Sequence, residues 1–70
     1  MKYSSEHLAE TMRAKREALN LNQTQFAYAI GSTQPIVSEY ECGKKTPSFR
    51  TAVKIADALG CSLDELVVND

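Results

Sequence analysis

The 70 residues of the chain carry eight basic and nine acidic side chains, and this net charge of −1 excludes the strongly basic profile of a domain that binds nucleic acid through overall charge. Two cysteines and one histidine exclude a disulfide scaffold and give no zinc-ligand spacing, and no apolar run suits a membrane span or a signal peptide. We therefore expect one small cytoplasmic domain over residues 1–70, with a core over residues 5–67, reduced thiols, no metal, no cofactor and no room for a separate sensing or catalytic domain.

The charges are unevenly distributed along the chain. Residues 1–50 carry seven basic and five acidic side chains, whereas residues 51–70 carry one basic and four acidic side chains. The acidic excess therefore lies in the last part of the chain. Any contact with phosphate must depend on where individual cations are placed.

The amino-terminal part of the chain predicts a first helix. Ser4 or Ser5 can cap its amino end, and Asn20 is a suitable residue to stop it. Apolar residues recur at spacings of four and seven, as on a helix that packs one face on a core: Leu8, Met12 and Leu19.

The middle of the chain predicts two short helices separated by a tight turn. Asn22 and Gln25 have the spacing of a capping box, and Gly31 suits a left-handed position after the first helix. Thr33 is expected to cap the second helix, with Pro35 in its first turn, where a missing amide hydrogen does little harm. Because neither helix is long enough to be stable alone, both must pack on the rest of the chain.

The last third of the chain predicts two further helices. Ser48 can cap the first of them and Gly60 can end it. Its apolar residues are expected to share one wide buried face: Phe49, Ala52, Ile55, Ala56 and Leu59. Ser62 and Glu65 form a second capping box, which opens a last helix through Leu66. With no strand pattern and no repeat, the expected fold is all-α, with five short helices around one core.

Several short motifs occur together along the chain at a characteristic spacing. None of them alone is specific for one family of proteins. They are Gln23, Phe26-Ala27, Ile30-Gly31, Val37-Ser38, Tyr40-Glu41, Gly43-Lys44, Pro47-Ser48, Ala56, Leu59-Gly60 and Ser62-Leu63-Asp64-Glu65-Leu66. Over about residues 8–67, this pattern resembles the lambda-repressor-like, Cro/CI-type (XRE-type) helix-turn-helix DNA-binding domains. The resemblance implies a compact five-helix domain whose central helix-turn-helix lays its second helix, the recognition helix, in the major groove of double-stranded DNA.

The resemblance also implies a division between side chains that anchor and side chains that read. Phosphate contacts supply most of the salt-dependent affinity, whereas contacts with base edges supply sequence preference. The expected phosphate contacts are Arg16, Asn22, Gln23, Thr33, Lys44 and Lys45. The expected base contacts are Gln34, Pro35, Ser38 and Glu39. Gln34 is the strongest candidate, because a side-chain amide can pair with N6 and N7 of adenine.

Arg16 and Glu41 match family positions that resemble an ion pair between the first and third helices. We expect this pair to brace the recognition helix and to leave Arg16 able to touch a phosphate.

Chains of this family commonly act as homodimers, so that two recognition helices match the half-sites of a palindromic operator about one helical turn apart. The dimer interface is expected to involve Leu66, Val67 and Val68.

The leading hypothesis is therefore a sequence-specific DNA-binding regulator of transcription, a repressor of a phage, mobile-element or small bacterial operon. Two alternatives stay open: an antitoxin that binds both DNA and a toxin protein, and a protein-interaction module that does not bind DNA. The sequence shows no nucleophile–base arrangement and no metal cluster, so we do not expect an enzyme.

Overall fold

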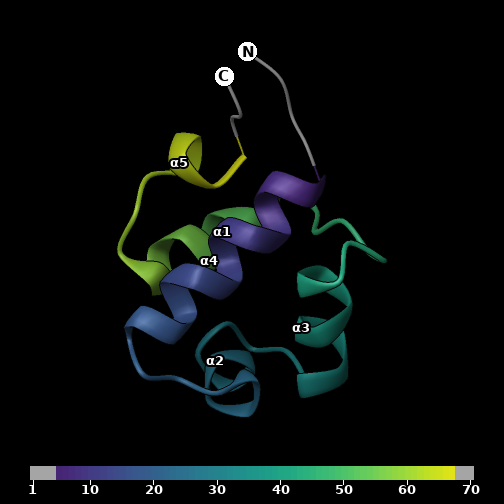
Figure 1. The fold of residues 1–70 in the computed structure, drawn as a ribbon, viewed down its shortest axis with the longest axis vertical. Helices are drawn as coiled ribbons and strands as arrows, with labels where there is room; N and C mark the ends of the chain where they lie inside the picture. Colours follow the sequence, from purple (N-terminus) through teal and green to yellow (C-terminus); the bar gives the residue numbers. More distant parts are fainter. Residues whose placement is uncertain (1–4, 68–70) are drawn as a thin grey trace.

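Five α-helices make up residues 5–67, the part of the chain that the computed structural model describes (Figure 1). Their bounds are α1 Ser5–Ala18, α2 Gln23–Ala29, α3 Gln34–Glu41, α4 Phe49–Leu59 and α5 Leu63–Val67. No strand occurs within this range. The expected all-α fold with five helices is confirmed.

The predicted helix starts rest on short local hydrogen bonds. Asn22 Oδ1 accepts from the amide of Gln25 at 2.7 Å, and Gln25 Oε1 accepts from the amide of Asn22 at 2.8 Å, so the capping box of α2 is confirmed. Ser62 and Glu65 form the same reciprocal pair before α5, with both distances 3.1 Å. Ser48 Oγ accepts from the amide of Thr51 and caps α4. These contacts satisfy amides that a helix start otherwise leaves unpaired.

The turn between α2 and α3 is closed by Gly31. Its φ is +69°, a left-handed conformation, and its amide donates to the carbonyl of Tyr28 at 3.2 Å. The amide of Ser32 donates to the carbonyl of Ala27 at 2.8 Å. These two bonds form a Schellman motif, which ends α2 and redirects the chain into α3.

The end of α1 corrects the predicted apolar stripe. Asn20 stops the helix as expected, with φ +61°, but Leu19 lies after the last helical residue and is 48% exposed. The amide of Leu21 donates back to the carbonyl of Arg16, so the left-handed turn carries Leu21, and not Leu19, against the core.

Two further details of the prediction are wrong. Phe49 is 75% exposed, because it is the first residue of α4 and lies beyond the edge of the core. Thr33 occupies the cap position of α3, but its side chain makes no capping hydrogen bond. Pro35 explains part of this, since proline removes one of the two amides that a cap residue normally binds. Ser4, the other candidate cap of α1, lies outside the described residues.

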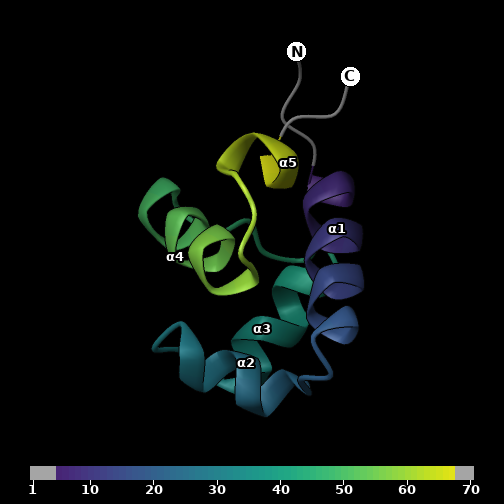
Figure 2. The same ribbon diagram turned by 90° about the vertical axis from the view of Figure 1, so that its left-hand side faces the viewer.

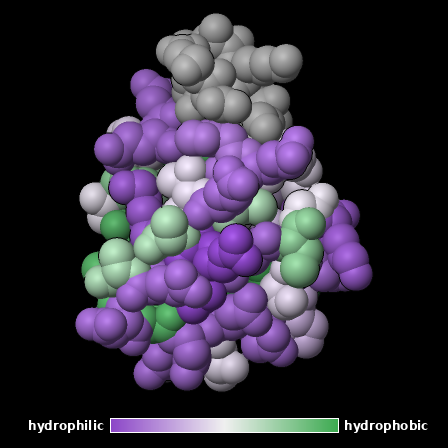
Figure 3. All heavy atoms as spheres, in the orientation of Figure 1, coloured by the Kyte–Doolittle hydropathy of each residue, from purple (hydrophilic) through white to green (hydrophobic). Residues whose placement is uncertain are grey.

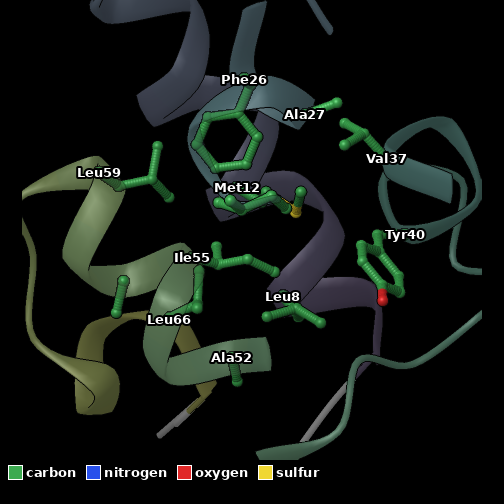
Figure 4. Close-up of a cluster of buried hydrophobic side chains, with 12 residues drawn as sticks. Leu8, Met12, Phe26, Ala27, Val37, Tyr40, Ala52, Ile55, Leu59 and Leu66 are labelled. Atoms are coloured by element: carbon green, nitrogen blue, oxygen red, sulfur yellow. The ribbon is translucent and has the colours of Figure 1, made fainter. Parts of the chain in front are cut away.

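The core draws side chains from all five helices (Figure 4). Met12 lies at its centre in the close-up, with Phe26 on one side and Ile55 and Leu8 on the other. Six large side chains in this core are fully buried: Leu8, Met12, Phe26, Val37, Ile55 and Leu66. Hydrophilic side chains cover most of the face seen in Figure 3, and apolar atoms reach it only in separate patches.

α1 is the helix on which the others are assembled. It contacts α3, α4 and α5, and α2 in turn packs on α3. In both ribbon views α2 lies at one end of the molecule, and α5 and the first turn of α1 lie at the other (Figures 1 and 2). The helix-turn-helix pair therefore occupies the end of the molecule opposite α5.

Candidate nucleic-acid interface

One face of α3 is turned to solvent. Gln34 and Pro35 at its amino end are exposed, and Ser38 and Glu39 one turn later are half-buried. The last three of these residues lie one, four and five positions after Gln34, which places all four on a common side of the helix. The remaining side of α3 is anchored by buried residues: Val37, Tyr40 and Glu41. The four predicted base contacts are thus brought together, with the amino end of the helix the most accessible.

The first residue of α3 is held by the first residue of α2. Gln34 Nε2 donates to Gln23 Oε1 at 2.8 Å. An amide nitrogen carries two hydrogens, so Gln34 keeps one N–H and its own Oε1 for another partner. One donor beside one acceptor is the pattern that matches N7 and N6 of adenine. Both glutamines are predicted site residues, but their contact was not predicted from sequence, where the only signal is that each opens its helix.

The ion pair between α1 and α3 is confirmed. Arg16 Nε and a terminal guanidinium nitrogen lie 2.7 Å and 3.0 Å from the two carboxylate oxygens of Glu41, and both residues are 7% exposed. The hydrogen bonds to Glu41 raise the pKa of Arg16, burial opposes the shift, and the negative charge of Glu41 adds to it. Arg16 is therefore charged at any working pH, and it ties α3 to α1.

The predicted phosphate contact of Arg16 has to come from a guanidinium group that the protein already holds. Its second terminal nitrogen donates to the carbonyl of Leu21 at 2.7 Å, while the other two nitrogens face Glu41. All three guanidinium nitrogens are thus engaged inside the protein. The structure gives Arg16 a bracing role, and because each terminal nitrogen carries a second N–H, its phosphate contact stays a prediction.

A further hydrogen bond joins the ion pair to the glutamines. Gln23 Nε2 donates to Glu41 Oε1 at 3.0 Å. A continuous chain of side-chain contacts thus runs from buried Arg16 through Glu41 and Gln23 to exposed Gln34. Nothing in the sequence pattern predicted this connection, because its members come from three helices.

The predicted phosphate anchors other than Arg16 flank α3 and open α2. Lys44 and Lys45 are exposed just after α3, and Lys45 Nζ lies 3.7 Å from a carboxylate oxygen of Glu39. This ion pair is open to solvent, so it is weak, but it offsets an acidic charge beside the expected DNA surface. Thr33 is exposed at the other end of α3, and its hydroxyl makes no capping bond.

The opening of α2 supplies the last of the predicted anchors. The side chain of Asn22 is committed to its capping box, so Asn22 can offer a phosphate little besides its position at the helix start. Gln23 keeps one amide hydrogen after its bond to Glu41. This N–H and the first-turn amides of α2 are the donors that this segment can present.

The predicted dimer residues fall into three different situations. Leu66 is fully buried in the core, so it has no surface to offer a second protomer, and its place in that prediction is wrong. Val67 is half-buried and lines an apolar groove of about 290 Å³, whereas Val68 lies outside the described residues. The groove runs between α4, α5 and the loop before α4, and its other lining residues are Thr46, Pro47, Phe49, Ala52 and Leu63.

Other classes of site find little support. Within residues 5–67, no three His, Cys, Asp or Glu side chains gather as a metal ion would require. Over the same range, no helix combines the length and the apolar character needed to cross a bilayer.

Comparison with known proteins identifies the family. A family described as Helix-turn-helix matches residues 12–66 of the chain. The chain belongs to this helix-turn-helix family, of the Cro/CI (XRE) type. The family's central unit is the α2–α3 pair, so the exposed face of α3 lies on the element that gives the family its name.

A curated relative and a solved structure extend this result. The cryptic phage CTXphi transcriptional repressor RstR of Vibrio cholerae serotype O1 is 41% identical over 59 residues, which are 84% of this chain and 53% of RstR. The chain thus spans about half the length of that relative. The P22 c2 repressor, solved in complex with a synthetic operator, is 27% identical with a TM-score of 0.85, covering 90% of this chain and 96% of that one.

The same fold also occurs within an enzyme. Hydroxypropylphosphonic acid epoxidase from S. wedmorenis matches with a TM-score of 0.85 and 26% identity, over 96% of this chain but only 36% of that one. The likeness therefore concerns about a third of the epoxidase. It does not make this helix-turn-helix chain an enzyme, and the family assignment points to a regulator that binds DNA.

Proposed function

We propose that this chain is a sequence-specific regulator of transcription that places α3 in the major groove of double-stranded DNA and acts as a cytoplasmic repressor. The observation that carries this proposal is the presentation of Gln34. It lies exposed at the amino end of α3, held by Gln23, with one donor and one acceptor left for a base edge.

The anchoring contacts are proposed to flank this reader. Lys44 and Lys45 follow α3 and can reach phosphates on one side, while Thr33 and the opening of α2 at Gln23 serve the other. Pro35, Ser38 and Glu39 complete the proposed base-reading face. Because the net charge of the chain is −1, affinity has to come from these local contacts and not from an overall positive field.

Repression is the direction of control that the relatives favour. RstR is named as a transcriptional repressor, and the P22 c2 repressor was solved on a synthetic operator. A domain that occupies an operator can block transcription by excluding other proteins from the same DNA. The names of these relatives contain nothing that supports the toxin partner considered above.

We also propose that the chain binds its operator as a homodimer. The apolar groove beside Val67 lies at the α4–α5 side, and Phe49 on its rim is 75% exposed. A second copy seated there would cover this apolar surface and would pair two α3 helices for a palindromic site. Sedimentation equilibrium with and without operator DNA tests this, and a monomer that binds a single half-site would contradict it.

Selection of bound duplexes from a random pool tests the function itself. The expected result is an enriched palindromic site whose binding weakens steeply as salt rises, because phosphate contacts release counterions. A promoter that overlaps the enriched site, placed before a reporter, then tests repression. Failure to retain any duplex at low salt would contradict the proposal.

A further inference from the structure

We propose that Glu41 is a positioning residue that sets the direction of the Gln34 side-chain amide, and thereby makes α3 choose adenine over guanine. This inference rests on the proposed function, since it matters only if Gln34 faces a base. Glu41 itself is 7% exposed and has little surface to offer a base. Its influence would pass through Gln23.

The chemistry of the three side chains fixes which atoms face one another. A carboxylate accepts hydrogen bonds and cannot donate them, so the group of Gln23 that faces Glu41 must be its amide nitrogen. The carbonyl of Gln23 then faces Gln34, which must turn its own nitrogen toward it. Gln34 is left with Oε1 and one N–H for the groove.

This arrangement distinguishes the two purines. Adenine offers N7 as an acceptor and N6 as a donor, which match the N–H and Oε1 of Gln34. Guanine offers two acceptors, N7 and O6, so Oε1 would face another acceptor. We therefore expect a preference for adenine of about tenfold at the base pair that Gln34 reads.

Removing the buried ion pair as a unit should free the direction of both glutamine amides. Arg16→Met with Glu41→Leu takes away both charges, so no buried charge is left without its counterpart. Gln23 then has no carboxylate that requires its nitrogen. Its amide, and with it the amide of Gln34, can turn either way, so both purines can be matched.

Adding Gln23→Glu to this variant should restore the original direction. A carboxylate at position 23 can only accept, so Gln34 must again turn Nε2 toward it and keep Oε1 for the base. A role of Glu41 in stability alone gives no reason for a further substitution at the DNA surface to recover adenine preference.

The experiment measures, for each variant, competition between duplexes that differ only by adenine or guanine at the position read by Gln34. Arg16→Met with Glu41→Leu should lower the adenine-to-guanine ratio by about tenfold, close to parity, and the further substitution Gln23→Glu should return it toward the wild-type value. Preferences at other base pairs should stay unchanged. Glu17→Gln is the matched control, because Glu17 lies 3.8 Å from Arg16 but is exposed and outside the chain of amides.

Gln23→Met keeps the test decisive if the variant without the ion pair does not fold, since it breaks the contact with Gln34 and leaves Arg16 and Glu41 in place. It should bring the two purines close to parity. Gln34→Ala identifies the base pair that Gln34 reads, because the preference is lost there. If Gln23→Met and the variant without the ion pair both keep the wild-type ratio at that base pair, this inference is overturned and the proposed function stays intact. A wild-type protein that binds no duplex would instead overturn the proposed function.

Discussion

Gln34 Nε2 lies 2.8 Å from Gln23 Oε1, and this hydrogen bond joins the opening residues of the two helices of the helix-turn-helix. Gln23 is held in turn by buried Glu41, so the side chain of Gln34, the proposed base contact, is supported from within the domain although it is exposed. Such support reduces the rotamer freedom that Gln34 would otherwise lose on meeting DNA. On the proposed function, this support orders the base-reading face of α3 before DNA binds.

Gln34→Ala should weaken binding at one base pair only. We expect a loss of about 1–3 kcal/mol on the preferred site and a relaxed preference at that position, because the substitution removes a two-point contact with a base edge. Competition among duplexes substituted one position at a time measures this. A uniform loss over all positions would show that Gln34 anchors and does not read.

Lys44→Ala should have the opposite profile. Lys44 is exposed just past α3, and removing a phosphate contact weakens every sequence alike and lowers the slope of affinity against salt by about one. Titrations at several salt concentrations give the slope. Lys54→Ala is the matched control, since Lys54 is an exposed lysine on α4, outside the proposed contacts. Equal slopes for the two variants would contradict the anchoring role.

The local features of the fold were predictable from sequence, because they depend on residues three or four positions apart. The capping boxes at Asn22 and Ser62 and the helix stop at Asn20 belong to this class. The ends of the apolar stripes were not predictable in this way, because Leu19 and Phe49 were expected to be buried and are exposed. Periodicity gives the direction of a side chain on an ideal helix, but not the residue at which the helix leaves the core.

The same distinction applies to the site. The sequence predicted candidate base contacts on the segment that forms α3 and, through the resemblance, the pair of Arg16 with Glu41. It did not show that Arg16 would be engaged by Leu21 as well, or that Gln23 would touch both Glu41 and Gln34. Those contacts depend on how α1, α2 and α3 cross, which no pattern within a single helix specifies.

The buried pair of Arg16 and Glu41 should show strong coupling in stability. Removing either partner leaves a buried charge without its counterpart, so Arg16→Met or Glu41→Leu alone should destabilise the domain by about 3–5 kcal/mol. The double variant should lose far less than the sum, because neither charge remains. Urea unfolding of the four proteins measures the coupling, and additive losses would show that the pair does not act as a unit.

Cys61 should react slowly with iodoacetamide. Burial raises the pKa of its thiol above the ordinary value; Lys15 opposes the shift and Glu65 adds to it. A raised pKa leaves less thiolate at a given pH, so the alkylation rate should reach its midpoint at higher pH in the folded protein than in urea. Peptide mapping by mass spectrometry follows both thiols, and exposed Cys42 should be modified first. Equal rates for the two thiols in the folded protein would contradict this expectation.

Gly31→Ala should destabilise the domain through the backbone and not through crowding. A Cβ at this position meets no atom within 4 Å, but φ is +69°, where an L-residue other than glycine is strained by about 1–2 kcal/mol. We expect the midpoint of urea unfolding to fall by a corresponding amount with an unchanged slope. Gly31→Asn is the control, because asparagine tolerates the left-handed region better and should lose less. Equal losses for alanine and asparagine would mean that the strain at this turn does not set the cost.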